Sequence, residues 1–282
     1  MSIIINYKNI PVALVGRKIK TDMKAPDFVL IADDLSKVRL GDCDGKIKIL
    51  TSFLSLDTSG SDLQVKEYEK RASSITDDVV VLGISNDLPF AQKRFCQSNS
   101  IEKVRLLSDY RYSSFGINYG LLIKELNLLA SAIVILDKNN NIRYFDILDE
   151  ATDTPDFDMW LSCLEQILTE PSIPVDKRLP YKCIPCEAGV LPFVDNLVEK
   201  YMKEIKDWKL INKRISKTFK FKDFVEAKYF IDLLAIIAEE QGHHPDLKLW
   251  YNKLDVELTT HAIGGLSEND FIMAKIIDEL EV

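Results

Sequence analysis

Histidine is scarce in this chain, which has only three among 282 residues, at positions 243, 244 and 261. Long apolar runs are also missing, because Lys8, Asn9 and Pro11 interrupt the N-terminal MSIIINYKNIPVALVG well short of a signal segment or a bilayer span. The net charge is −8 without any basic block, so nucleic-acid binding has no electrostatic support. Five cysteines, an odd number without a secretory signal, argue against a disulfide framework. We therefore expect a cytoplasmic protein with neither a membrane nor a nucleic acid as partner.

What the chain does contain is enough apolar sequence for two cores. Its length and its 46% of hydrophobic residues predict two domains. Five of the ten prolines fall between positions 171 and 192, where they disfavour both helix and central strand. We predict a first domain over 1–169, a proline-rich linker with a CxxC motif over 170–191, and a second domain over 192–282.

The first domain alternates short apolar runs with helical patterns. The runs KIKILTSF (46–53), DVVVLGIS (78–85) and ASAIVILD (130–137) are typical of strands buried on both faces by helices. The turn DKNNN at 137–141 leads into IRYFDI and predicts a β-hairpin, and an amphipathic helix is predicted from about 156 to 168. This order indicates an α/β domain.

The second domain has a different order of elements. A helix at about 192–206 precedes two strands in WKLINKRISKTFKF, a long helix, two more strands in DLKLWYNKLDVELTT, and a final helix from Ser267. Helices packed on one face of an antiparallel sheet would make this an α+β domain.

One segment of the first domain, SLDTSGS (55–61), follows a predicted strand and begins the next helix, where backbone N–H groups and the helix dipole stabilise an anion. Together with KAPDFVLIADDLSKVRLGD, ISNDLPFAQKRFC and LSDYRYSSFGINYG, it resembles the atypical two-cysteine peroxiredoxins called thiol peroxidases, over roughly residues 5 to 168. The resemblance implies a thioredoxin-like fold.

The resemblance also implies a peroxidase site that this chain has altered. The family's Pro-x-x-x-Thr-x-x-Cys pattern corresponds to Leu54, Thr58 and Ser61 here, so the peroxidatic cysteine is replaced by serine. The family's activating arginine corresponds to Ser131, whereas the resolving-type Cys96 is kept. A serine hydroxyl is not ionised at neutral pH and forms no sulfenic acid. We therefore expect no peroxidase activity; a structural or dimerising module, a partner-binding module, and residual thiol chemistry through Cys96 are the alternatives.

The paired histidines lie in EEQGHHP (239–245), just beyond the predicted long helix. That helix opens with Asp223 and Glu226 at capping-box spacing, and Gly242 and Pro245 end it. An imidazole here can interact with the last helical carbonyls, bind a metal, or transfer a proton. Adjacent histidines after a helix do not converge on one ion, and no cysteine is near in sequence, so the spacing argues against metal.

The third histidine, His261, is predicted to end the strand DVELTTH on the face opposite Leu254, Val256 and Leu258. Three histidines within 19 residues are poorly explained by chance on a surface. Proton transfer near neutral pH is the chemistry that fits them best.

The full spacing of Glu239, the His-His-Pro triplet, Tyr251, His261 and Asp270 resembles pterin-4a-carbinolamine dehydratase, over about residues 183 to 281. The segments SKTFKFKDFVEA, LWYNKLDVELTTH and GGLSENDF carry the same resemblance. It implies a four-stranded antiparallel sheet with helices on one side, a homo-oligomeric assembly, and loss of water from 4a-hydroxytetrahydropterin to give quinonoid dihydropterin. Neither a metal nor an organic cofactor is implied.

The resemblance assigns roles to particular residues. His243, His244 and His261 are implied as the acid/base groups, without a distinction between acid and base. Substrate contacts are implied for Pro245, Thr260, Ala262 and Ile263. Glu239 and Asp270 are implied either as substrate contacts that hydrogen-bond the pterin or as groups that orient the imidazoles.

Several of these positions have a second interpretation. Asp270 lies three residues after Ser267, as in the N-terminal cap of a helix, and Glu239 is also typical of a solvated helix charge. Trp250 and Tyr251 either pack in the sheet or face the substrate. Gly242 stands where some relatives carry an acid.

Partners follow from the same resemblance. The carbinolamine is the product of a pterin-dependent aromatic amino acid hydroxylase, and molybdopterin metabolism is an alternative pathway. A non-catalytic binding or assembly protein is the second hypothesis. The motif of Cys183 and Cys186 is half of a structural zinc site, and we interpret it as part of an N-terminal extension of the second domain.

Overall fold

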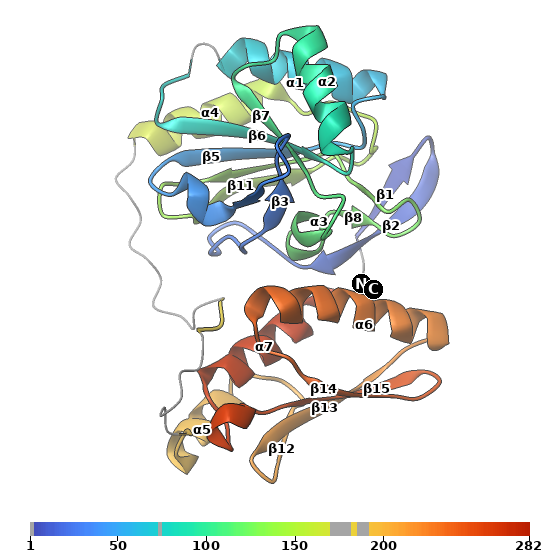
Figure 1. Cartoon of the computed structure of the whole chain (residues 1–282), viewed down its shortest axis with the longest axis vertical. Coiled ribbons are helices and arrows are strands. Elements are labelled where there is room, and N and C mark those ends of the chain that lie inside the picture. Colours follow the sequence, from blue (N-terminus) through green and yellow to red (C-terminus); the bar gives the residue numbers. More distant parts are fainter. Residues whose placement is uncertain (1–2, 73–74, 170–181, 185–191) are drawn as a thin grey trace. The chain divides into compact units, whose positions relative to one another are not determined.

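The computed structural model describes residues 3–72, 75–169, 182–184 and 192–282, which form two compact units divided at Asp176 and Lys177 (Figure 1). Most of the predicted linker, Cys186 included, lies outside the described residues. The two units are described separately below.

The N-terminal unit is built on a seven-stranded sheet in the order β11-β10-β5-β6-β7-β3-β4. The three predicted apolar runs are three of its strands, β5 (Ile47–Ser52), β6 (Val79–Ser85) and β10 (Ala132–Leu136). The remaining strands of the sheet are β3 (Val29–Ile31), β4 (Lys37–Arg39), β7 (Val104–Ser108) and β11 (Ile142–Ile147). β5, β6 and β7 are parallel, whereas β10 pairs antiparallel with both β5 and β11, which confirms the predicted hairpin.

Helices cover this sheet and bury its apolar strands. Tyr68 of α1 (Ser59–Ala72) and Trp160 of α4 (Phe157–Thr169) are fully buried in one core cluster with Ile49 and Ile135. The unit's other helices are η1 (Leu40–Cys43), α2 (Pro89–Asn99) and α3 (Ser114–Asn118). This arrangement is the predicted α/β, thioredoxin-like fold.

A smaller sheet of the N-terminal unit has the order β1-β2-β8-β9. Its strands are β1 (Ile4–Tyr7), β2 (Ile10–Arg17), β8 (Leu122–Ile123) and β9 (Leu128–Leu129). The β1–β2 hairpin, which the sequence patterns did not predict, turns at Lys8 and Asn9, both with positive φ.

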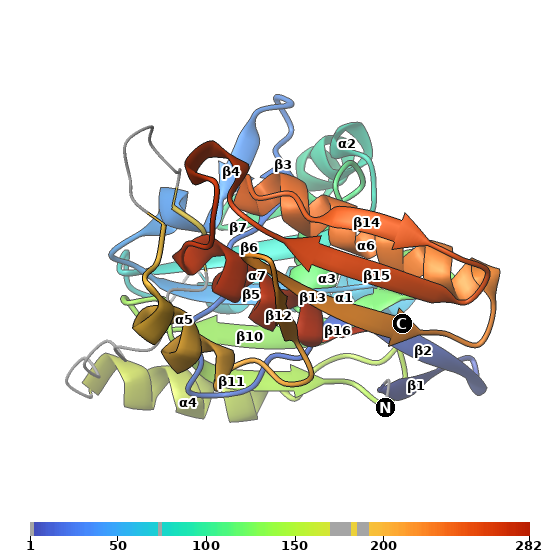
Figure 2. The ribbon, with the colours of Figure 1, turned by 90° about the horizontal axis from the view of Figure 1, so that it is seen from below.

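The C-terminal unit is a four-stranded antiparallel sheet in the order β12-β13-β15-β14 with helices α6 and α7 on one face (Figures 1 and 2). The strands are β12 (Lys209–Ile211), β13 (Arg214–Lys220), β14 (Asp246–Leu249), β15 (Lys253–Leu258) and, outside this sheet, β16 (Leu280–Glu281). The helices are α5 (Asp195–Met202), α6 (Phe224–Gln241), η2 (His261–Ile263) and α7 (Glu268–Asp278). The predicted α+β class is confirmed.

The buried face of α6 differs from the predicted one. Helical spacing in the sequence predicts one apolar face made of Phe224, Ala227, Ile231, Leu234, Ala235 and Ala238. In the structure, however, Phe224 is 47% exposed and Ala235 is also exposed. The residues that contact the core are Ala227, Phe230, Leu233, Leu234, Ile237 and Ala238. Apolar residues surround this helix on most sides, so their periodicity alone could not select the face that packs on the sheet.

The predicted first helix of this unit is also shorter than expected, because α5 covers only Asp195–Met202 of the range 192–206. Among the described residues, no helix combines the length and the apolar character needed to cross a membrane.

Candidate active site

The C-terminal end of α6 places the paired histidines outside the helix. Asp223 caps the start of α6 by accepting a hydrogen bond from the Glu226 N–H. At the other end Gly242 adopts φ +61°, and the His243 N–H donates back to the Ala238 carbonyl. A left-handed residue at this position ends the helix and turns the chain away from its axis. His243 and His244 therefore project from the junction between α6 and β14.

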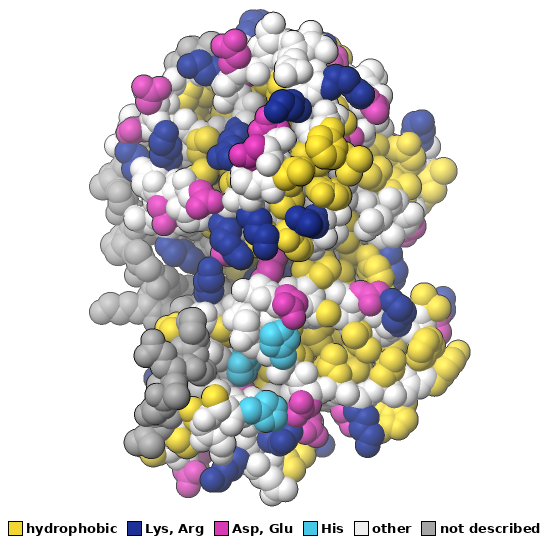
Figure 3. Space-filling model, viewed as in Figure 1, with side chains coloured by type: hydrophobic (Ala, Val, Ile, Leu, Met, Phe, Trp, Pro, Cys, Tyr) yellow, Lys and Arg dark blue, Asp and Glu magenta, His cyan; other side chains and the backbone are white. Residues whose placement is uncertain are grey.

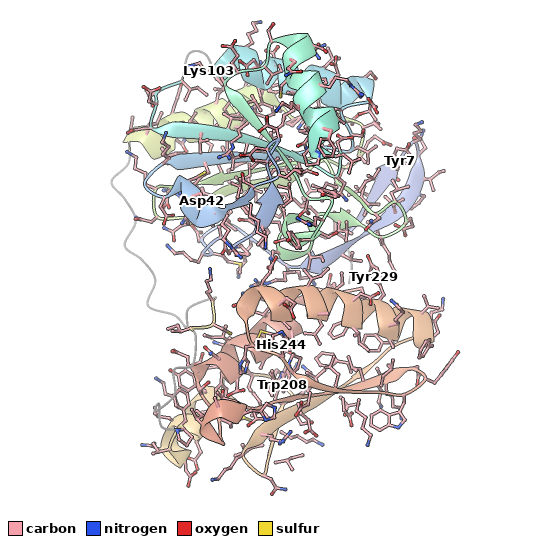
Figure 4. The ribbon with its side chains drawn as sticks, viewed as in Figure 1. Tyr7, Asp42, Lys103, Trp208, Tyr229 and His244 are labelled. Carbon is pink, nitrogen blue, oxygen red and sulfur yellow. The ribbon has the colours of Figure 1, made fainter. Side chains whose placement is uncertain are left out.

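Each of the three histidines has its own carboxylate partner. The Nε2 atoms of His243, His244 and His261 lie 2.8, 2.9 and 3.6 Å from carboxylate oxygens of Asp270, Glu239 and Asp246, respectively. Figure 3 shows the three imidazoles gathered on one face of the C-terminal unit, and Figure 4 labels His244 near the end of α6. Of the residues in the predicted spacing, the three histidines, Glu239 and Asp270 take part in these pairs, and Tyr251 does not.

The pairs differ sharply in burial. The side chain of Asp270 is 0% exposed and that of His243 is 10% exposed, whereas those of His244 and Glu239 are 60% and 79% exposed. An ion pair in open solvent holds its geometry weakly, and a buried one holds it firmly. His243 is therefore the fixed member of the group.

Asp270 holds His243 from within a dense hydrogen-bond network. Its Oδ2 atom accepts from the Ser267 N–H at 2.7 Å and from the Thr260 hydroxyl at 2.8 Å, and its Oδ1 atom faces His243. Because a carboxylate only accepts, the proton of this contact lies on Nε2 of His243, which leaves Nδ1 as the second functional atom. Ser267 and Asp270 also form the capping box that begins α7, so the helix-cap interpretation of Asp270 is confirmed, and the same carboxylate contacts His243.

His261 does not end a strand, contrary to the prediction. β15 stops at Leu258, and His261 opens the 3₁₀ turn η2, because Thr260 forms an isolated bridge with Gly265 that turns the chain. The His261 side chain is 63% exposed.

The carboxylate beside His261 was missed in the sequence. Asp246 lies 3.6 Å from its Nε2 atom and is itself paired with Arg214 at 2.7 Å. The sequence did carry a signal for Asp246. It directly follows His-His-Pro and begins a predicted strand, and that strand pairs with the one that precedes His261.

The other predicted contacts divide into two groups. Thr260 is buried, Pro245 and Ile263 are half-buried, and Ala262 is exposed, all within the segments that carry the histidines. Trp250 and Tyr251 instead occupy the turn between β14 and β15, at the opposite end of the hairpin, and are 45% and 69% exposed. Neither packs in the sheet, and neither joins the histidines.

The N-terminal unit places Thr58 and Ser61 at the start of α1 and Ser131 next to β10. The hydroxyls of Thr58 and Ser61 are hydrogen bonded at 2.8 Å, and Ser61 is buried. Asp87 fixes the preceding loop by accepting from the Ser55 hydroxyl and the Leu56 N–H. Ser131, also buried, donates to the Ala151 carbonyl at 2.7 Å.

Cys96 lies on α2, partly buried against the core of the N-terminal unit. Burial raises the pKa of its thiol, and the carboxylates of Asp33 and Glu69 raise it further. A pocket separates this helix from the loop before α1, with Leu56 and Asp57 on one side and Arg94 and Phe95 on the other. Within the described ranges, no three His, Cys, Asp or Glu side chains converge closely enough to hold a metal ion.

Comparison with known proteins assigns each unit to a family. Residues 20–161 match the family model described as Redoxin, and residues 192–280 match the model described as pterin 4 alpha carbinolamine dehydratase. The chain is a redoxin with a pterin dehydratase domain. Both predicted resemblances are thereby confirmed.

The relatives of the redoxin domain are thiol peroxidases. That of Staphylococcus saprophyticus is 44% identical over 163 residues, which cover 58% of this chain and 98% of that protein. Among solved structures, a peroxiredoxin-like protein from Aquifex aeolicus is 32% identical with a TM-score of 0.55 and covers 58% of this chain and 96% of that chain.

The pterin dehydratase domain also has a solved relative. A transcriptional coactivator/pterin dehydratase from Brucella melitensis is 31% identical and covers 31% of this chain and 95% of that chain, with a TM-score of 0.30. The three histidine–carboxylate pairs described above all lie in the pterin dehydratase domain.

Proposed function

We propose that the C-terminal domain dehydrates 4a-hydroxytetrahydropterin to quinonoid dihydropterin. The observation that carries this proposal is the convergence of three imidazoles, each with its own carboxylate, at one end of the β14–β15 hairpin. Imidazoles beside carboxylates are suited to accept and return protons near neutral pH.

The reaction requires one proton to be delivered and one to be removed. The bond between C4a and the hydroxyl oxygen breaks while a histidine gives its proton to the departing oxygen, which leaves as water. A second histidine takes the proton from the adjacent ring nitrogen, whose electron pair forms the new double bond to C4a. No net proton is gained or lost. Each turnover leaves the acid deprotonated and the base protonated, and proton exchange with solvent restores both histidines.

We assign these transfers to His261 and one of the pair His243 and His244, on either side of C4a. His261 and His244 are more than half exposed, so each can exchange protons with solvent, whereas His243 is held by a buried carboxylate. Pro245, Thr260, Ala262 and Ile263 belong to the same two segments and would contact the ring. The chemistry needs no metal or organic cofactor, since both steps are proton transfers.

Stopped-flow dehydration of synthetic 4a-hydroxytetrahydropterin tests this proposal. The wild-type chain should accelerate the reaction, and His261→Ala should slow it by about 10²-fold, the usual loss when a positioned acid or base is removed. The same measurement on His243→Ala and His244→Ala identifies the second proton-transfer group. Absence of acceleration by the wild-type chain would defeat the enzyme assignment in favour of a binding or assembly role.

The physiological setting that we propose is recycling of a tetrahydropterin used by an aromatic amino acid hydroxylase, with the chain acting as a homo-oligomer. The support is chemical, because the substrate is the oxygenated pterin that such a hydroxylase releases.

The similarity to thiol peroxidases favours a second candidate, thiol-dependent reduction of peroxides by the redoxin domain. Against it stands the buried Ser61, hydrogen bonded to Thr58, where we expect the family's nucleophilic cysteine. We propose that this domain has lost peroxidase turnover and serves a structural or binding role. Robust consumption of hydrogen peroxide by the purified chain with a dithiol reductant would overturn this view and would point to Cys96.

A further inference from the structure

Residues 182–184 lie against the junction between α6 and α7. The Cys183 N–H donates to the side-chain oxygen of Gln241, the last residue of α6, at 2.8 Å. The side chain of Asn269, in the first turn of α7, pairs with the backbone of Ile184 by accepting from its N–H at 3.0 Å and donating to its carbonyl at 2.6 Å. The Cys183 thiol also lies 3.7 Å from the Asn269 carbonyl oxygen. This short segment therefore connects the two helix ends.

The same two helix ends carry the buried half of the histidine site. His243 follows Gln241 by two residues, and Asp270 directly follows Asn269. The contact between His243 and Asp270 is one link across this junction, and the segment 182–184 is a second link beside it. Because adjacent hydrogen bonds in a buried network support one another, loosening one link lets the other shift.

Burial indicates that this second link is firmly made. Cys183 is 7% exposed and Asn269 is 6% exposed. Buried polar groups cost free energy when they lose their partners, and the Asn269 amide meets both backbone groups of Ile184 at once. An amide that pairs with a peptide group at two points also fixes its orientation, which a single hydrogen bond would not.

We propose that Cys183 and Ile184 brace the histidine site and that Asn269 is a positioning residue for the His243–Asp270 pair. The functional dehydratase unit then begins before residue 192, where the match to its family model starts. The catalytic part of this proposal rests on the proposed dehydratase function, whereas the brace itself does not.

The test uses the full chain with Asn269→Ala, which removes both bonds to Ile184. Asn252→Ala is the matched control, because Asn252 also donates from its side-chain amide to a backbone carbonyl, that of Phe221, beside the distant β14–β15 turn. If Asn269→Ala does not fold, Gln241→Ala removes the bond to Cys183 alone and carries the same measurements.

Three readouts apply to each variant. Alkylation of Cys183, followed by mass spectrometry of its peptide, should be about 10-fold faster in Asn269→Ala because local opening exposes the thiol. The kcat for dehydration should fall by about 10-fold or more while KM changes little, since a misplaced group affects the transition state more than binding. The NMR signal of the His243 Nε2 proton, assigned by its loss in His243→Ala, should broaden or disappear. Asn252→Ala should match the wild type in all three.

The outcomes separate the two proposals. Cys183 that stays protected in Asn269→Ala overturns the brace, and a reactive Cys183 with unchanged kcat and an unchanged His243 signal overturns the positioning role. If the wild-type chain lacks dehydratase activity, the proposed function fails, the thiol readout still decides the brace, and the NMR readout still decides the positioning role: an unchanged His243 signal refutes that role, and a lost one supports it.

Discussion

Replacing Asp270 with asparagine should abolish most of the dehydratase activity while leaving the fold in place. The two oxygens of Asp270 have different partners: Oδ2 accepts from the Ser267 N–H and the Thr260 hydroxyl, and Oδ1 accepts from His243. An asparagine has one oxygen and one NH₂ group. Its oxygen must stay towards the Ser267 N–H, because a backbone donor cannot change direction, so its NH₂ group has to face His243.

That orientation reverses the protonation of the imidazole. An NH₂ group can only donate, so Nε2 of His243 must become the acceptor, and the ring proton moves to Nδ1. This prediction takes His243 as the member of the pair that transfers the proton. A buried histidine fixed in the wrong tautomer cannot perform that step, and such a reversal costs on the order of 10² to 10⁴ in rate. The loss in unfolding free energy should be smaller, roughly 1–3 kcal/mol, because the bonds to Ser267 and Thr260 survive and the bond to His243 is only weakened.

Stopped-flow kinetics and urea denaturation of Asp270→Asn measure the two quantities separately. Glu239→Gln is the control, since it makes the same chemical change beside His244 but at a carboxylate that is 79% exposed. We expect that variant to lose less activity than Asp270→Asn, because an exposed carboxylate holds its histidine more weakly than a buried one. A rate for Asp270→Asn within threefold of wild type in a folded protein would refute the tautomer argument.

The remaining predictions address other parts of the chain. Tyr251→Ala should leave dehydration unchanged, because Tyr251 lies at the far end of the β14–β15 hairpin, and a clear loss of kcat would show that the tyrosine reaches a site. Iodoacetamide should modify Cys96 more slowly than a free cysteine at neutral pH and accelerate as pH rises, because burial and nearby carboxylates raise the thiol pKa; a rate already constant with pH around neutrality would contradict this. Gly242→Ala should lower the free energy of unfolding in urea by about 1–2 kcal/mol, because Gly242 has φ +61°, a backbone conformation that is strained for an L side chain. The space around a Cβ is open, so no clash adds to this loss; an unchanged value would mean that the helix end adapts.

Sequence patterns predicted the helices and strands that carry a strong local signal. The apolar runs of β5, β6 and β10 are long and uninterrupted, and the cap and terminator of α6 have strong local chemistry. The β1–β2 hairpin escaped because its turn uses Lys8 and Asn9 at positive φ rather than the usual Asn-Gly or Gly-Gly. Short strands such as β8 and β9 have two residues each, too few for any periodicity.

The site was partly predictable for a similar reason. The three histidines, Glu239 and Asp270 stand out by type and spacing, and the structure gathers them. Asp246 did not stand out, because its closeness to His261 depends on the pairing of β14 with β15 and on the turn η2, which are tertiary features. Tyr251 shows the converse, since it fits the spacing pattern and yet lies apart from the histidines.

Asp270 serves two structures at once, as it begins α7 and holds His243. Two separate requirements therefore limit which amino acids position 270 can accept. A replacement that preserves the helix start still misplaces the imidazole, and one that suits the imidazole leaves the helix uncapped. In a saturation mutagenesis library, position 270 should tolerate fewer amino acids than His244, although His244 is itself one of the imidazoles of the site. Folding yield and turnover should decline together in variants at position 270 that lose both the helix cap and the contact with His243, whereas Asp270→Asn should keep the fold and lose turnover, so a selection for solubility alone would not preserve the His243 environment.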